Sequence, residues 1–207
     1  MNGAVCSASG VSLDGTDDYV NITPWRFGGA TSFEVYVKYD SFNSNSRVLG
    51  FSSGQASDNV ILHNQGTTST IRSYVNQGST GKYLDKSYFD SATWTHVVVT
   101  VSGANMKTYK NGVLVGTKTD GHEPNVMTRT NHIIGISDWV IGISDWGFDG
   151  TIASVKMGHG VEARRKLPDL PPALTTISRL PHLSPSFFPS QPRAAHRLRR
   201  HLPVRSP

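Results

Sequence analysis

Three aspartates lie within five residues near the start of the chain, in the segment LDGTDDYVNI at positions 13–22. Carboxylates at this spacing could form a turn, bind a metal ion or supply half of a catalytic pair. The run Asp14-Gly15-Thr16-Asp17 favours a tight turn, because aspartate side chains accept hydrogen bonds from nearby amides and glycine tolerates positive φ. We therefore predict an architectural role for Asp14, Asp17 and Asp18, with metal binding as the alternative.

The rest of the chain offers little to catalysis by paired carboxylates. Glycoside hydrolysis requires two such groups roughly 5–9 Å apart, on either side of the sugar bond. The glutamates of the chain are Glu34, Glu123 and Glu162, and no two are close in sequence. Asp17 and Asp18 are adjacent, so on a strand they would point to opposite faces. The sequence therefore predicts a protein that is not an enzyme.

The elements that must position these residues are strands. In SFEVYVKY (32–39), every second residue from Phe33 to Tyr39 is apolar, the period of a sheet with one buried face. Similar short runs follow between clusters of Ser, Gly, Asn and Asp: SRVLGFS, NVILHN, STIRSYV, THVVVTV, MKTYK and VLVGTK. Asn111-Gly112, between the last two, is a preferred pair for a tight hairpin. No segment before residue 160 has a capped helical period, so the pattern predicts an all-β sandwich or jelly roll.

The composition changes near residue 160. All 20 glycines lie at or before Gly160, whereas nine of the 11 prolines lie after it. The first 160 residues carry 11 Lys/Arg against 13 Asp/Glu, and the remainder carries nine against two, so the basic pI comes from the C-terminal part. We predict one jelly-roll domain over 1–160 and a disordered Pro/Arg-rich tail over 161–207. Nucleic-acid binding is not expected of the mildly acidic domain.

Other features of the sequence bear on disulfide formation, secretion and membrane insertion. Cys6 is the only cysteine, so no intrachain disulfide can form. The first ten residues show no charged segment followed by an apolar stretch, so no signal peptide is visible. No stretch approaches the roughly 18 apolar residues of a membrane span. Localisation stays open, with an extracellular location expected if the chain is part of a longer secreted protein.

The hexapeptide IGISDW occurs twice, at 134–139 and 141–146, separated by Val140. The seven-residue offset is odd, so a strand running through both copies would present them on opposite faces. We expect one copy in the sheet and the other in a bulged loop, where insertions cost little.

Three stretches together resemble the laminin-G-like, pentraxin-related branch of the concanavalin-A-type jelly rolls. The segment LDGTDDYVNI is similar to the opening strand of that family. The segment WTHVVVTVSGANMKTYKNGVLVGT (94–117) is similar to its pattern of Trp-x-His-Val-x-Val-Thr followed by Tyr-x-Asn-Gly. The segment FDGTIASVKM (148–157) is similar to its final strand. The resemblance implies a two-sheet antiparallel jelly roll that binds sugars, proteins or lipid head groups, usually outside the cell and often with calcium.

Two positions depart from the family pattern. Ala153 follows Ile152 where the family often has an acidic residue. The closing strand expected after Met157 runs into the proline-rich tail, so we expect an incomplete sheet edge there.

The same resemblance implies a weak calcium site. Asp58-Asn59 resemble the pair that pentraxins place before Ile-Leu, and Asp138 in IIGISDW matches the carboxylate of their second loop. Calcium takes about six to eight oxygen ligands, so two or three side chains predict weak binding. The alternative for Asp58-Asn59 is an ordinary turn.

Tryptophans are the remaining candidates for ligand contact, since sugars stack on exposed aromatic rings. Trp25, Trp139 and Trp146 lie in or beside predicted loops, whereas Trp94 is expected in the core at a strand start. We predict a non-catalytic recognition module for an extracellular glycan or protein, with calcium as an auxiliary ligand. The alternatives are a structural or adhesive domain without a sugar site and, more remotely, a glycoside hydrolase of the concanavalin-A-type fold.

Overall fold

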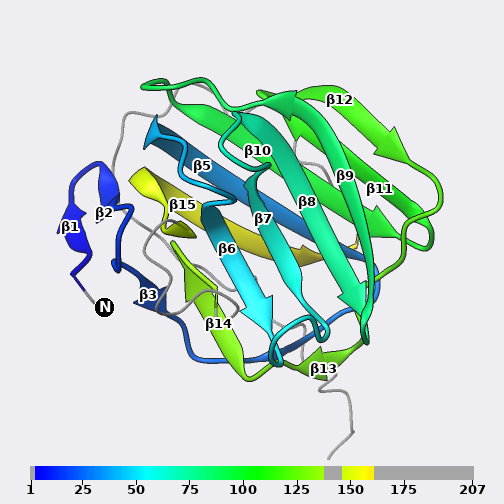
Figure 1. Cartoon of the computed structure of the whole chain (residues 1–207). Helices are drawn as coiled ribbons and strands as arrows, with labels where there is room; N and C mark the ends of the chain where they lie inside the picture. The colour runs from blue at the N-terminus through cyan, green and yellow to red at the C-terminus, as the bar shows by residue number, and fades with distance from the viewer. Residues whose placement is uncertain (1–2, 138–145, 161–207) are drawn as a thin grey trace, which may run out of the picture.

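The computed structural model describes residues 3–137 and 146–160, which form a sandwich of two main antiparallel sheets (Figure 1). The seven-stranded sheet has the order β1 (Val5–Ser7), β2 (Gly10–Asp14), β15 (Asp149–His159), β5 (Thr31–Ser41), β10 (Thr95–Ser102), β11 (Asn105–Lys110) and β12 (Val113–Lys118). The six-stranded sheet has the order β3 (Val20–Asn21), β14 (Asn131–Ile134), β6 (Arg47–Ser52), β7 (Val60–Asn64), β8 (Thr70–Gln77) and β9 (Thr80–Tyr88). A small ladder joins β4 (Arg26–Phe27) to β13 (Met127–Thr128). The all-β, two-sheet jelly-roll prediction is confirmed.

The core lies between the two sheets, where the alternation of the sequence places its apolar side chains. On β5 the buried residues are Phe33, Val35, Val37 and Tyr39, and the intervening side chains are partly exposed. They pack against the inward side chains of the opposite sheet, which include Leu49, Phe51, Leu62, Ile71 and Val75. Burial of this apolar surface is the main stabilising term of the fold. Within the described residues, no helix is long and apolar enough to cross a membrane.

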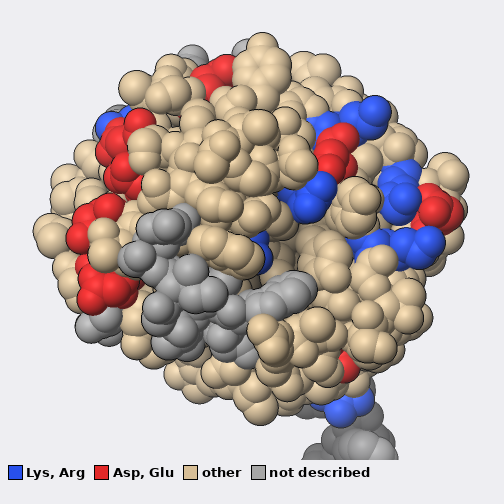
Figure 2. All heavy atoms as spheres, in the orientation of Figure 1, with Lys and Arg blue, Asp and Glu red and all other residues tan. Residues whose placement is uncertain are grey.

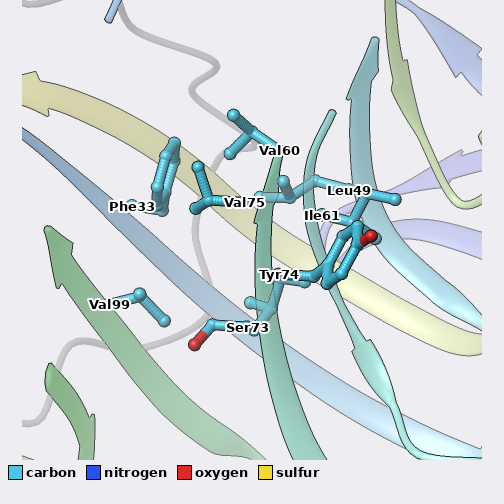
Figure 3. A pocket seen from close by; sticks show the side chains of 9 residues that line it. Phe33, Leu49, Val60, Ile61, Ser73, Tyr74, Val75 and Val99 are labelled. Carbon is cyan, nitrogen blue, oxygen red and sulfur yellow. The ribbon is translucent and has the colours of Figure 1, made fainter. Parts of the chain in front are cut away.

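A small cavity remains in this core (Figure 3). Its volume of about 10 Å³ corresponds to roughly one water molecule. It is lined by apolar side chains of both sheets, among them Phe33 and Val99, and by Ser73, whose buried Oγ has no hydrogen-bond partner within the described part of the chain. The cavity is therefore too small for an organic ligand.

The predicted β11–β12 hairpin is confirmed. Its turn residues Asn111 and Gly112 have φ of 50° and 81°. Asn111 also accepts a hydrogen bond at Oδ1 from the His96 amide, 2.9 Å away. The Asn-Gly pair thus provides positive φ and anchors the turn to β10.

One expectation about the seven-stranded sheet is wrong and another stays a prediction. The last strand, β15, is 11 residues long and pairs with β5 along its length, but it pairs with β2 only from Asp149 to Ile152, so the incomplete edge expected after Met157 stays a prediction. Trp94 is not in the core: it is half-buried and stacks on Tyr36, with ring centroids 4.9 Å apart. Tyr36 occupies one of the outward positions of β5, which places this stack on the outside of the sandwich.

Candidate functional site

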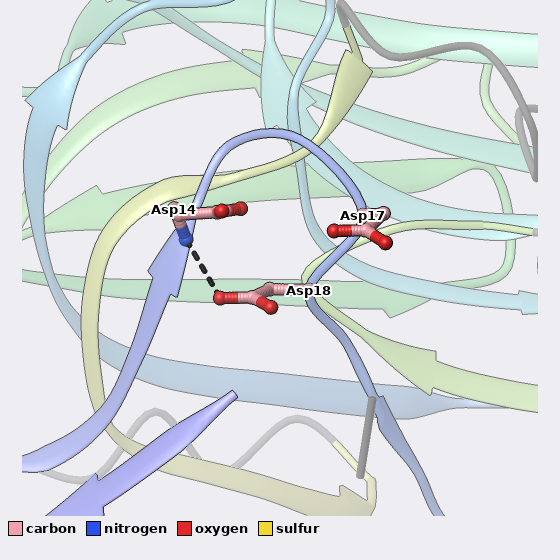
Figure 4. Close-up of side chains that lie close together, drawn as sticks. All are labelled: Asp14, Asp17 and Asp18. Atoms are coloured by element: carbon pink, nitrogen blue, oxygen red, sulfur yellow. Dashed lines mark hydrogen bonds between the residues drawn. The ribbon is translucent and has the colours of Figure 1, made fainter. Parts of the chain in front are cut away.

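The N-terminal aspartates form the turn that the sequence predicts (Figure 4). Asp14 Oδ1 accepts a hydrogen bond from the Thr16 amide at 2.9 Å, Asp18 Oδ2 accepts one from the Asp14 amide at 3.0 Å, and Gly15 has φ of 79°. Burial raises the pKa of Asp18, and the neighbouring carboxylates act in the same direction. One oxygen from each of Asp14, Asp17 and Asp18 lies within 4.8 Å of the others. The two hydrogen bonds make the carboxylates of Asp14 and Asp18 parts of a turn.

Asp58 and Asn59 lie in the loop between β6 and β7. Asp58 has φ of 52°, and its Oδ1 accepts hydrogen bonds from the Gly78 amide at 3.0 Å and from Asn125 Nδ2 at 2.7 Å. The Arg129 guanidinium donates to the main-chain oxygen of Asp58. The fully buried Asn59 side chain is oriented to donate to loop carbonyl groups. Both residues already have structural partners, with a cationic side chain beside them, and so do not fit a strong calcium site.

The remaining residues predicted for the calcium and ligand sites are Asp138 and the three tryptophans. Asp138 and Trp139 lie outside the described residues. Trp25 is half-buried and packs against the core, with its ring edge-on to His132 at a centroid distance of 4.3 Å. Trp146 is half-buried beside the six-stranded sheet, against Ile133 and Ile136. The metal and ligand roles given to these residues stay predictions.

The outer face of the six-stranded sheet brings together polar side chains that sequence reasoning did not connect. Because Val60 and Leu62 point into the core, Ile61 and His63 point outward. Antiparallel pairing then aligns outward residues of four neighbouring strands into rows across the sheet. The charged row consists of Arg47 on β6, His63 on β7, Arg72 on β8 and Asp85 on β9.

Two further rows complete this face. The aromatic row consists of Ile133 on β14, Gly50 on β6, Ile61 on β7, Tyr74 on β8 and Tyr83 on β9. Two residues further along the strands, alternation brings polar side chains to the same face. This amide row consists of Ser52, Asn59 and Asn76. The face therefore combines cations, rings and amides over β6–β9.

Arg47 is the most unusual member of the charged row. Its side chain is only 4% exposed, and burial lowers its pKa to about 10. Nη1 donates to the main-chain oxygen of Asn45 at 2.6 Å and lies 2.9 Å from Nδ1 of His63. The guanidinium carbon lies 5.2 Å from the ring centroid of Trp146. Within the described residues, Arg47 has no carboxylate partner, and its Nε has no hydrogen-bond partner.

Burial and ion pairing determine the charge states of His63 and Arg72, the neighbours of Arg47 in the charged row. Burial and the adjacent Arg47 hold the pKa of His63 well below its ordinary value, so the imidazole is neutral at neutral pH. Arg72 donates two hydrogen bonds to Asp85, at 2.6 and 2.5 Å, which raises the pKa of Arg72. Tyr83, 50% exposed, lies over the Arg72 guanidinium at 4.4 Å. Asp85 is thus engaged by Arg72, and among the described residues no carboxylate is paired with Arg47.

Figure 2 shows this face of the molecule. Lys and Arg side chains alternate with Asp and Glu side chains on the right, near β8, β9 and the opposite sheet, and acidic side chains gather along the left edge. Tan surface lies between these charged groups in the upper part of the view.

Comparison with known proteins identifies the superfamily that shares this architecture. A family model described as the concanavalin A-like lectin/glucanases superfamily matches residues 14–159. A pentraxin from Limulus polyphemus has 16% sequence identity and a TM-score of 0.55, with 74% of this chain and 77% of that chain covered. Domain 4 of an extracellular arabinanase from Geobacillus stearothermophilus, in complex with arabinotriose, has 18% identity and a TM-score of 0.54, covering 69% and 66%.

A third solved structure is the CBM40 domain of a Ruminococcus gnavus sialidase bound to α2,3-sialyllactose. It has 13% identity and a TM-score of 0.50, with 66% of this chain and 88% of that chain covered. No curated protein matches the sequence. At these identities the solved structures establish a shared fold.

Proposed function

Because the chain belongs to the concanavalin A-like lectin/glucanase superfamily, we propose that it is a non-catalytic carbohydrate-recognition domain. The observation that carries the proposal is the outer face of β6–β9, where the charged, aromatic and amide rows lie side by side. Sugar sites combine ring surfaces, which stack on the apolar faces of the pyranose, with amides and charged groups that bind its hydroxyls. The arabinanase domain and CBM40 domain, both solved with sugars, support the class of ligand.

The acidic residues of this face support a binding role over a catalytic one. The six strands of the sheet contain one carboxylate, Asp85. It accepts two hydrogen bonds from Arg72. Glycoside hydrolysis uses a pair of carboxylates, one of which must exchange a proton with the sugar oxygen. A single carboxylate held by a guanidinium suits neither task.

An array of neutral and acidic oligosaccharides tests the proposal, with a matched pair of variants on one strand. Tyr83 and Tyr88 both lie on β9 and are 50% and 56% exposed, but Tyr88 contacts Lys110 of the opposite sheet instead of Arg72. We expect Tyr83→Ala to weaken glycan binding roughly 10-fold, since ring stacking contributes about 1–2 kcal/mol, and Tyr88→Ala to leave it unchanged. Equal loss in both variants, or no glycan bound by the wild type, would contradict the proposal.

Calcium remains a proposed weak ligand of Asp58, Asn59 and Asp138. The hydrogen bonds on Asp58 and the nearby Arg129 argue for an affinity no better than about 10⁻⁴–10⁻³ M, the range of weak extracellular sites. Repeating the array with a calcium chelator, and with Asp58→Ala, tests this separately. Binding that is indifferent to the chelator would remove calcium from the proposal and leave sugar recognition standing.

The alternative is an adhesive domain that binds protein without a sugar site. The specific observation in its favour is the β11–β12 hairpin, where Val113 and Leu114 are 65% and 49% exposed. Exposed apolar side chains of this kind are common at protein-binding surfaces. A domain that binds no glycan but captures a protein through this hairpin would favour the alternative, and Val113→Ser with Leu114→Ser would then abolish capture.

A further inference from the structure

We propose that the sugar bound by this domain is acidic, and that its anionic group is neutralised by Arg47 in the charged row. The inference rests on the proposed function and specifies its ligand. The chemistry is that of a carboxylate or a sulfate ester, either of which presents oxygens to a guanidinium.

The first argument is the charge of the site. A buried guanidinium is normally paired with an acidic group, because an isolated charge is costly to remove from water. Arg47 is 4% exposed, and the described residues provide it with a backbone carbonyl, a neutral imidazole and a tryptophan ring. None of these cancels its charge. The sole carboxylate of the charged row, Asp85, is bound to Arg72 by two hydrogen bonds.

The second argument is the set of buried side-chain atoms on this face that have no hydrogen-bond partner among the described residues. Among the described residues of this face, Nε of Arg47, Oγ of Ser52, the amide of Asn76 and Oγ of Ser137 are buried without a hydrogen-bond partner. Ser137 lies directly against Gly50, where a Cβ would overlap with it. Buried polar groups without partners are rare in folded proteins and are costly to retain. Several such polar groups on one face fit a ligand that carries both an anionic group and hydroxyl groups.

The third argument is the arrangement of rings. Trp146 lies over Arg47 and Tyr83 lies over Arg72, so each guanidinium of the charged row has an aromatic neighbour. Rings in these positions could stack on a sugar whose anionic group reaches the guanidinium beside or beneath them. Because Trp146 covers Arg47, entry of the anion must change the surroundings of the indole. We therefore expect ligand binding to change the tryptophan fluorescence, and Trp146→Phe to remove that change.

The test uses the full chain on an array in which each neutral oligosaccharide core is also printed in a carboxylate-bearing and a sulfate-bearing form. We expect signals on the acidic members, falling as salt concentration rises. The carboxylate and sulfate arms distinguish the two sources of the anion. Equal signals on neutral and acidic members would overturn this inference while leaving the proposed function intact. The absence of signal on every member would overturn both.

Arg47→Met is the decisive variant, because it should lower the affinity for the acidic glycan without lowering the stability of the domain. Replacement of a buried charge that has no carboxylate partner among the described residues by an apolar side chain of similar volume is often neutral or stabilising, so we expect the melting temperature to stay level or rise. Affinity for the acidic glycan should fall roughly 10-fold or more, which corresponds to loss of a charge-assisted hydrogen bond. Lys107→Met, on β11 of the other sheet, removes the same charge elsewhere and should leave affinity unchanged.

Asp85→Asn provides a second variant in case Arg47→Met fails to fold. It frees the Arg72 guanidinium from its carboxylate partner and should strengthen acidic binding several-fold. A fall in acidic binding, or unaltered binding in a folded Arg47→Met protein, would overturn the assignment of the charged row.

Discussion

At the scale of single residues, the burial of two neighbouring basic side chains distinguishes this molecule. Arg47 and His63 are 4% and 5% exposed, and they are in contact on the outer side of the six-stranded sheet. Nδ1 of His63 lies 2.9 Å from Nη1 of Arg47 and 2.7 Å from the main-chain oxygen of Asn64. Protonation of this imidazole would place two cations in contact. The pKa of His63 is lowered accordingly, chiefly by its burial.

This depressed pKa predicts that stability falls on mild acidification. In the unfolded chain His63 titrates near its ordinary pKa of about 6.5. Between the folded and unfolded values the unfolded state binds more protons, so the free energy of unfolding decreases as the pH falls below about 6.5. Melting curves between pH 7.5 and about pH 5 should show this slope.

Two variants identify its source. His63→Gln should flatten the slope, whereas His159→Gln, which removes an exposed imidazole, should leave it as in the wild type. An unchanged slope in His63→Gln would show that another group controls the acid sensitivity.

At the scale of elements, β15 depends on close backbone contacts that admit only glycine. Gly150 has φ of 145°, and a Cβ at this position would overlap with the main-chain oxygen of Lys38 on the neighbouring strand β5. The ladder shifts register at this point, between Asp149 and Gly150. A glycine here lets β15 bend and still pair along both sides.

Gly150→Ala should therefore destabilise the domain by roughly 2–5 kcal/mol, from backbone strain and steric overlap together. For a domain of this size that corresponds to a fall in melting temperature of about 5–15 °C. Gly66→Ala is the control, since Gly66 also has positive φ, 56°, but no atom lies within 4 Å of the added Cβ. Its cost should be about 1–2 kcal/mol from backbone strain alone. Equal melting temperatures for the two variants would refute the contact with β5.

At the scale of the whole molecule, two sheets with complementary roles share one core. The seven-stranded sheet contains the long pair β5–β15, whose ladder runs from Thr31 to Ser41. The six-stranded sheet carries the charged, aromatic and amide rows on its outer side. A rigid sheet holds such side chains at fixed spacing, and this reduces the entropy lost on ligand binding.

A chain ending at Gly160 should retain this architecture. The Gly160 amide donates to the Ala30 oxygen at 2.9 Å, so the last described contact of the sandwich is made by residue 160. We expect residues 1–160 to melt within about 2 °C of the full chain, a difference of about 1 kcal/mol or less. A much lower melting temperature would show that residues 161–207 contribute to the fold, contrary to the predicted domain boundary.

The sequence by itself determined the class of fold and its turns. Alternation in SFEVYVKY identified the buried face of β5, and Asn111-Gly112 identified the hairpin, because both signals depend on residues near each other in the chain. The Asp14–Asp18 turn was predicted for the same reason. The local pattern also indicated strands in NVILHN and STIRSYV, which are β7 and β8.

Only the tertiary structure decided which distant residues meet on that face. Arg47, His63, Arg72 and Asp85 come from four strands, and their alignment depends on pairing register and on the irregularities between Arg47 and Leu49 and between Thr70 and Arg72. The interior position of β15 likewise follows from its pairing with β2, which is remote in sequence. Periodicity along one strand fixes which side of a sheet a residue occupies, but its cross-strand neighbours are set by packing of the entire core.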